Sequence, residues 1–187
     1  MELQHINTKI YLKDGIVPES EKIVSIFHKW IQEKAADELL IDVADYKHVP
    51  NGPGVILIGH EANYSLDYGP ENRAGLLYNV KIKKDGNAAA KISHSLRQAA
   101  KACERMEKSD GFKFNPAKIR VIFNDRALVA NTEESFHSIK SELQQVFGKI
   151  SDSATFEKVS LDPRERLTVQ VSLSGPRELS KIAETLG

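Results

Sequence analysis

The chain has 187 residues, and its 26 basic and 26 acidic side chains give a formal net charge of zero. This balance argues against a general polyanion-binding protein, and the single cysteine excludes a disulfide scaffold. Hydrophobic residues make up 41% of the chain, which excludes dominant disorder, and no apolar run is long enough to cross a membrane. We expect one domain over residues 1–187 of a cytoplasmic protein, because the chain opens on no secretory signal.

The first half of the chain, about residues 1–110, predicts strands and helices from two hydrophobic periods. Alternating apolar and polar residues indicate strands, and apolar residues at helical spacing indicate helices. The strands expected in this half are 3–12, 39–43, Val55–Tyr68 and 75–83. The helices expected are 18–36 and 88–107, and the second of them buries the thiol of Cys103 on its apolar stripe.

The second half, residues 116–187, repeats this order of elements in shortened form. The strands expected in it are 119–123, 127–129, 155–161 and 167–173. The turn residues Asn124, Asp125 and Arg126 predict a tight hairpin between the first two of these strands. A helix capped by Asn131 and a C-terminal helix opened by Pro176 complete this half.

The order of these elements predicts an α+β fold, with a mainly antiparallel sheet and its helices on one face. Each half has the order strand, helix, hairpin, helix, which two tandem ferredoxin-like units would produce. We expect the two units to join edge to edge in one continuous sheet with one core.

The segment Asp42–Tyr68 departs from this pattern and is the candidate functional site. Its loop at 44–54 is rich in Gly and Pro, so a ligand can approach the backbone closely. On a regular strand His60 and Tyr64 share a face, so we predict a pocket under the loop with His60 as general base and Tyr64 beside it. The other residues expected there are the catalytic helper His48 and the ligand-binding residues Tyr46, Asn51, Gly52, Gly54, Glu61 and Tyr78.

Two other interpretations of His60 stay open. A histidine among apolar neighbours such as Ile58 is often a hydrogen-bonded core residue with no catalytic role. The second interpretation is that His60 binds a metal ion. Zinc-binding helices of the HExxH type carry a second histidine four residues after the first, and Tyr64 occupies that position here. The sequence therefore assigns no metal ligand and no cofactor.

The residues Asp45–Glu61 read DYKHVPNGPGVILIGHE, and they resemble a segment of an uncharacterised family of bacterial proteins of similar length. The resemblance extends over most of the chain and is densest in this segment. It implies a bacterial soluble protein, and it transfers no catalytic role because the family carries no assigned activity.

The helix at 88–107 carries a second, basic stripe opposite its apolar one. Residues 81–120 hold 11 basic and 4 acidic side chains, a net charge of +7. One interpretation is that the stripe binds an acidic partner, an anionic ligand or a nucleic-acid backbone. The other is that it is a solvated face whose cations lie near the helix C-terminus, where the helix dipole favours them. Its members are His94, Arg97, Lys101, Arg105 and Lys108.

Three functions follow from these patterns. The leading hypothesis is a cytoplasmic binding or regulatory module that holds a small molecule or a protein at residues 44–68. The alternatives are an enzyme that uses His60, and a weak polyanion or nucleic-acid binder that uses the basic stripe. Nucleic acid is not favoured, because no aromatic residues interleave with the cations, and no membrane partner is expected. Exposed sheet edges leave a homodimer open.

Overall fold

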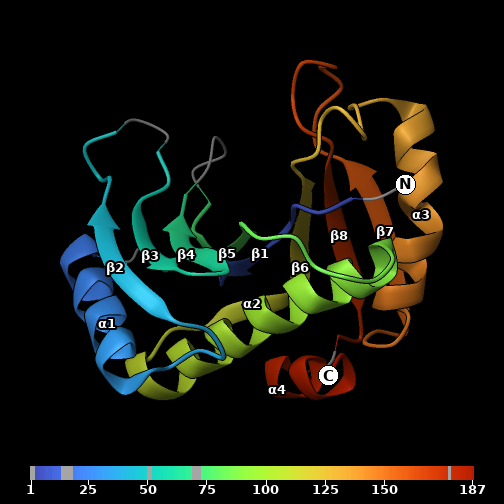
Figure 1. The fold of residues 1–187 in the computed structure, drawn as a ribbon. Helices are drawn as coiled ribbons and strands as arrows, with labels where there is room; N and C mark the ends of the chain where they lie inside the picture. The colour runs from blue at the N-terminus through green and yellow to red at the C-terminus, as the bar shows by residue number, and fades with distance from the viewer. Residues whose placement is uncertain (1–2, 14–18, 50–51, 69–72, 177) are drawn as a thin grey trace.

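The computed structural model describes residues 3–13, 19–49, 52–68, 73–176 and 178–187 (Figure 1). Its strands are β1 (Ile6–Leu12), β2 (Leu40–Asp45), β3 (Val55–Gly59), β4 (Ala62–Asp67), β5 (Gly75–Val80), β6 (Phe114–Phe123), β7 (Ser153–Lys158) and β8 (Thr168–Ser174). Its helices are α1 (Ser20–Glu33), α2 (Ala88–Asp110), α3 (Glu133–Phe147) and α4 (Leu179–Thr185). Among these helices, none combines the length and the apolar character that crossing a membrane requires.

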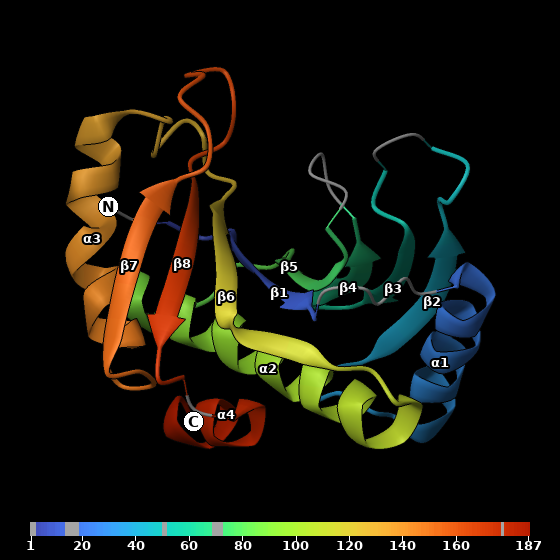
Figure 2. The ribbon, with the colours of Figure 1, turned by 180° about the vertical axis from the view of Figure 1, so that it is seen from behind.

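In the described part of the chain, eight strands form one antiparallel sheet in the order β2-β3-β4-β5-β1-β6-β8-β7. The predicted α+β fold and the continuous sheet are therefore confirmed. β1 lies in the middle of the sheet, between β5 of the first half and β6 of the second (Figures 1 and 2). Its register places Lys9 beside Leu77 on one side and Arg120 on the other. The pairing of β1 with β6 joins the two halves.

The helices cover one face of the sheet, as predicted (Figures 1 and 2). Thr8 of β1 accepts a hydrogen bond from Ser95 of α2, so alternate residues from Thr8 face the helices. In the same row, Tyr64 of β4 lies against Trp30 of α1. At the far end α3 packs on β7, while α4 packs on α2. The intervening residues, among them Lys9, face away from every described helix, and we call that side of the sheet the open face.

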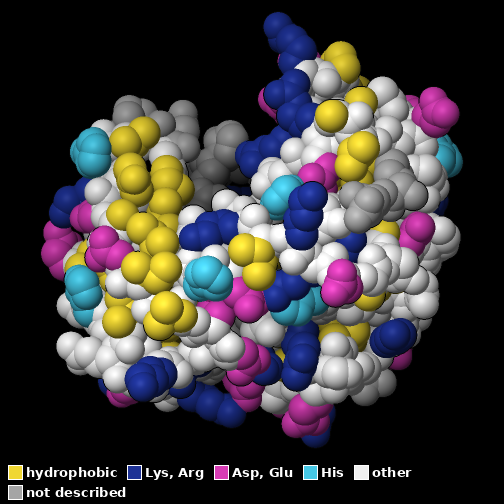
Figure 3. Space-filling view, viewed as in Figure 1, with side chains coloured by type: hydrophobic (Ala, Val, Ile, Leu, Met, Phe, Trp, Pro, Cys, Tyr) yellow, Lys and Arg dark blue, Asp and Glu magenta, His cyan; other side chains and the backbone are white. Residues whose placement is uncertain are grey.

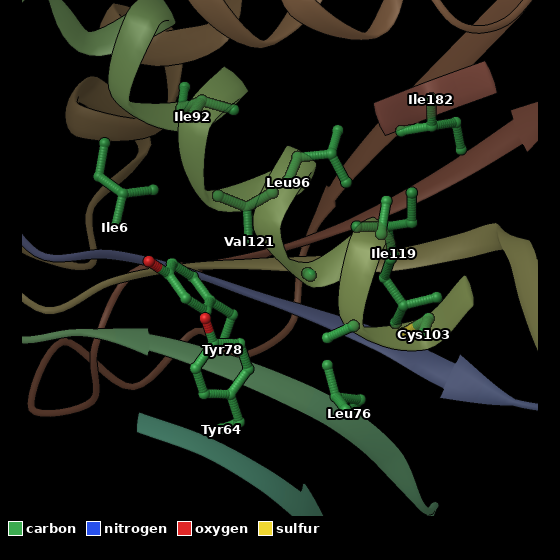
Figure 4. Close-up of a cluster of buried hydrophobic side chains, with 14 of the residues drawn as sticks. Ile6, Tyr64, Leu76, Tyr78, Ile92, Leu96, Cys103, Ile119, Val121 and Ile182 are labelled. Carbon is green, nitrogen blue, oxygen red and sulfur yellow. The ribbon is translucent and has the colours of Figure 1, made fainter. Parts of the chain in front are cut away.

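The hydrophobic core lies between the covered face and the helices (Figure 4). The predicted apolar stripe of α2 is confirmed, since Ile92, Leu96 and Cys103 have no exposed surface. Fully burying a side chain of this size stabilises the fold by about 1.5–3 kcal/mol. Burial also raises the pKa of the Cys103 thiol, which stays protonated and unreactive.

Residues 55–68 form a hairpin, and the prediction of one long strand there was wrong. β3 ends at Gly59 and β4 begins at Ala62. A Cβ atom on Gly59 would lie 2.5 Å from both the carbonyl oxygen of Ala62 and the carboxylate of Glu38. That carboxylate accepts hydrogen bonds from the backbone N–H groups of Glu61 and Ala62, at 2.5 and 3.0 Å. A side chain distant in the sequence thus stabilises the turn, and the local pattern did not show it.

The predicted hairpin around Asn124 is also wrong. β6 continues without a break to Phe123, and residues 126–128 form a turn where a second strand was expected. The first arm of that hairpin instead pairs with β1 and β8 on its two sides. An apolar segment with partners on both sides needs no local return strand.

The N-cap of α3 is Thr132, one residue after the predicted Asn131. The hydroxyl oxygen of Thr132 accepts a hydrogen bond from the backbone N–H of Ser135 at 3.1 Å. The side-chain amide of Asn131 instead donates to the carbonyl oxygens of Ser160 and Asp162, both at 2.9 Å. Asn131 therefore holds the β7–β8 connection against the start of α3.

Gly54 directly precedes β3 and has a left-handed backbone conformation, so its substitution can be tested. Its φ is +68°, and an added Cβ would lie 2.3 Å from the carbonyl oxygen of Leu66. We expect Gly54→Ala to lower the free energy of unfolding by about 2–4 kcal/mol, through left-handed strain plus overlap. Gly111→Ala is the matched control, since Gly111 has φ +75° but no atom within 4 Å of an added Cβ. Gly111→Ala should lower the free energy of unfolding by only about 1 kcal/mol. Equal losses in urea denaturation would contradict the role of the overlap.

Candidate functional site

His60 and Glu61, two of the predicted site residues, form the β3–β4 turn. The side chain of His60 is exposed, and its backbone N–H donates to the carbonyl oxygen of Leu39 at 2.8 Å. The carboxylate of Glu61 forms an ion pair with Lys84. His60 is therefore neither a core residue nor part of an enclosed pocket.

The loop that was expected to cover His60 lies at the opposite end of the hairpin. Tyr46 and His48 are exposed there and stack with ring centroids 6.3 Å apart. The four residue steps along β3 correspond to about 13 Å of extended chain between this loop and the turn. The predicted proximity of His48 to His60 is therefore wrong, because it depended on a single strand. Gly52 and Gly54 lie in the loop, while Asn51 falls outside the described residues.

Tyr64 and Tyr78 do lie together, as predicted, but on the covered face of the sheet. They are cross-strand partners with ring centroids 5.1 Å apart (Figure 4). The hydroxyl of Tyr64 donates to Glu38 at 3.1 Å, and that of Tyr78 hydrogen-bonds Nε2 of His94 at 3.4 Å. Burial raises the pKa of both phenols far above the ordinary value. Both tyrosines therefore stay neutral and hold β4 and β5 against the helices.

Glu38 and His94, both half-buried, complete this network, and sequence reasoning did not assign them to it. Glu38 is 26 residues from Tyr64 and shares no motif with it. His94 was placed on the basic stripe of α2, yet its ring lies 6.1 Å from that of Tyr78. Burial, assisted by the positive charge of Lys84, lowers the pKa of His94. A neutral imidazole suits a partner of a buried phenol.

The other members of the basic stripe are largely used within the molecule. Lys101 forms an ion pair with Asp37 at 2.6 Å, and Arg105 forms one with Glu33 at 2.5 Å. Lys108 forms an ion pair with Glu104, one turn earlier in α2. The stripe thus docks α2 against the end of α1 and the connection to β2.

A second group of cations lines a cleft of about 400 Å³ on the open face, which we call the basic cleft. The sheet contributes its floor, and the connections around residues 126 and 159–166 form its wall. Figure 3 shows a hollow between two lobes, with Lys and Arg side chains along one side of it. The described cations that line the cleft are Lys9, Arg120, Arg126, Arg164 and Arg166, and the described acidic residue is Glu165.

The centre of the open face brings three cations around one aromatic ring. Lys9, Arg73 and Arg120 place their charged groups 5.3, 4.5 and 5.5 Å from the ring centroid of Tyr11. These distances are typical of cation–π contacts. Gly75 leaves room for this arrangement, since a Cβ there would lie 2.9 Å from Cε of Lys9.

The wall of the cleft adds cations from two connections. Arg164 is paired with Asp162, and one guanidinium nitrogen of Arg166 donates to the side-chain oxygen of Asn124 at 2.9 Å. Arg126 is exposed. Among the residues that the structure describes, neither Arg126 nor Arg166 forms an ion pair with a carboxylate. Both guanidinium groups therefore keep donors for an anion.

Sequence reasoning missed the basic cleft because its cations are dispersed along the chain. Lys9 and Arg120 are 111 positions apart in the chain yet are cross-strand partners. Arg126 was interpreted as a turn residue, and Arg164 and Arg166 lie in a connection with no motif. The arginines of the two connections, Arg126 in one and Arg164 and Arg166 in the other, were the only sign of the cleft in the sequence.

Comparison with known proteins does not identify the chain, because neither the family models nor the curated proteins that were searched match it. The resemblance of Asp45–Glu61 to a bacterial family stays a prediction. In the described ranges, no three or more His, Cys, Asp or Glu side chains gather closely enough to hold a metal ion.

His94 provides a test of the buried network. Because its pKa is lowered in the folded protein, the unfolded chain binds a proton at a higher pH than the folded one. We expect the free energy of unfolding to fall as the pH drops below about 6.5, the ordinary pKa of histidine, through the folded value. His94→Gln should reduce this slope in urea denaturation between about pH 5 and 7.5. An NMR midpoint for His94 at or above 6.5 would contradict the lowered pKa.

Proposed function

We propose that the chain is a binding module for a small anionic molecule, one that carries phosphate or carboxylate groups and occupies the basic cleft. The observation that carries the proposal is the surplus of positive charge that Arg126 and Arg166 bring to a cleft of about 400 Å³, since neither forms an ion pair with a described carboxylate. The chain as a whole has no net charge, so this surplus is local. Clefts of this size commonly enclose ligands of small-molecule dimensions.

The chemistry of the lining residues supports an anion with more than one oxygen. Four of the five cations are arginines, whose planar guanidinium groups bind carboxylate and phosphate through paired N–H donors. Among the described residues, Arg126 and Arg166 form no ion pair with a carboxylate, so both keep N–H donors for such an anion.

The sheet favours this location over the segment 42–68. The strands β1, β6 and β8 hold the floor rigidly, while the connections beside them present Arg126, Arg164 and Arg166. Sites built on rigid strands and completed by surface connections are common. The sequence favoured a module for a small molecule or a protein at residues 44–68. The proposed function keeps the small-molecule alternative and assigns it to the basic cleft.

We also propose that the sheet consists of two overlapping ferredoxin-like units in a bacterial, cytoplasmic protein. β1, α1, β4, β5, α2 and β6 follow the βαββαβ order, with β2 and β3 as an added pair. The elements β6, α3, β7, β8 and α4 begin a second unit, in which β1 stands beside β6.

Calorimetric titration at low salt tests the proposed function. We expect inorganic phosphate, pyrophosphate or citrate to bind the wild-type chain, with affinity that falls as salt is added because the contacts are ionic. Arg126→Gln combined with Arg166→Gln should weaken binding at least about ten-fold, since each removes charge-assisted hydrogen bonds.

Lys34→Gln combined with Lys149→Gln is the matched control, because both lysines are exposed and neither lines the cleft. The control removes the same two positive charges from the chain, so its affinity should equal that of the wild type. Absence of binding by all three anions, or equal weakening by the control, would refute the proposal.

A further inference from the structure

We infer that the anion is a nucleoside phosphate, with its phosphate groups on the arginines and its base on an apolar strip of the basic cleft. This inference rests on the proposed function and names the class of ligand. Its basis is that the cleft is not uniformly charged. Ile122 and Val159 line it together with the cations.

These two apolar residues belong to one row of the open face. Ile122 of β6 pairs with Thr168 of β8, and the backbone N–H of Val159 donates to the carbonyl oxygen of Thr168 at 2.9 Å. The row therefore runs Ile122, Thr168, Val159 over three adjacent strand positions, about 10 Å from end to end. The strip is long enough to lie under a flat heteroaromatic ring.

The strip is apolar where the neighbouring row is charged. Arg120 and Gln170 lie two residues along the same strands, next to Ile122 and Thr168. A ligand that lies on the strip places its ring there and its oxygen-rich groups on Arg126 and Arg166, which line the same cleft. The exposed fraction is 36% for Val159 and 8% for Ile122, so Val159 presents most of the free apolar surface that a ring can contact.

This division favours a nucleotide over a simple anion. An inorganic phosphate or a small polycarboxylate would contact the arginines and leave the surface of Val159 in water. A base would bury that surface, and dispersion contacts with aliphatic side chains add to ring burial. The hydroxyl groups of Ser160 and Thr168, which also line the cleft, suit the hydroxyls of a ribose.

The test compares ligands that share the phosphates and differ in the base. We expect calorimetry to show that one or more of ADP, GDP, CDP and UDP binds at least about ten-fold more tightly than pyrophosphate, a ratio typical of an added apolar contact. Adenosine without phosphate should bind far more weakly. If pyrophosphate binds and no nucleotide binds more tightly, this inference is overturned while the proposed function stands.

The variant Val159→Ala separates the apolar strip from the charges. It should weaken nucleotide binding about five-fold and leave pyrophosphate binding unchanged, since only the base contacts the removed methyl groups. Leu161→Ala is the control, because Leu161 is in the same connection, is 80% exposed and does not line the cleft. Equal loss for pyrophosphate and nucleotide in Val159→Ala, or equal nucleotide loss in the control, would refute the placement of the base. Thermal unfolding of each variant confirms that it is folded.

Discussion

The pairing of β1 with β6 is the contact on which the rest of this structure depends. It joins residues 6–12 to residues 114–123, across more than half of the chain, and places β1 between the two halves of the sheet. Without it the strands of the first half and those of the second would form two smaller sheets with unpaired edges. The same register brings Lys9 beside Arg120, so the contact that unites the sheet also creates the centre of the basic cleft.

The two faces of the sheet differ in which side chains they carry. The covered face buries side chains such as Leu96, Ile119 and Val121 between strands and helices (Figure 4), and supplies most of the hydrophobic stabilisation. None of the described helices packs on the open face, so polar and charged residues can occupy it. Lys9 and Arg120 lie side by side on this face, and both place their charged groups near the ring of Tyr11.

The buried tyrosine pair shows how polar groups are accommodated on the covered face. Tyr64 and Tyr78 bring two hydroxyl groups into the core, and Glu38 and His94 bind them. Glu38 also accepts the two N–H groups of the β3–β4 turn, so one carboxylate satisfies both a core phenol and a turn. Tyr64, which the sequence suggested as a catalytic residue, and Tyr78, which it suggested as a ligand-binding residue, here hold β4 and β5 against the helices.

The sequence by itself determined which segments form helices and which residues of them are buried. The stripe Ile92, Leu96, Cys103 follows from helical spacing, and the pattern of β8 follows from strict alternation, because both signals are local. The α+β class and the position of the helices on one face follow from the order of the elements.

Tertiary contacts decided the turn at His60, the continuous β6 and the position of the basic cleft. Each of these depends on residues that are remote in the sequence: Glu38 for the turn, β1 and β8 for β6, and Lys9 with Arg120 for the cleft. A local pattern reports how side chains alternate along a strand, but it carries no information about which strand lies next to it. Cations that are dispersed along the chain therefore come to line one cleft only when the sheet is assembled.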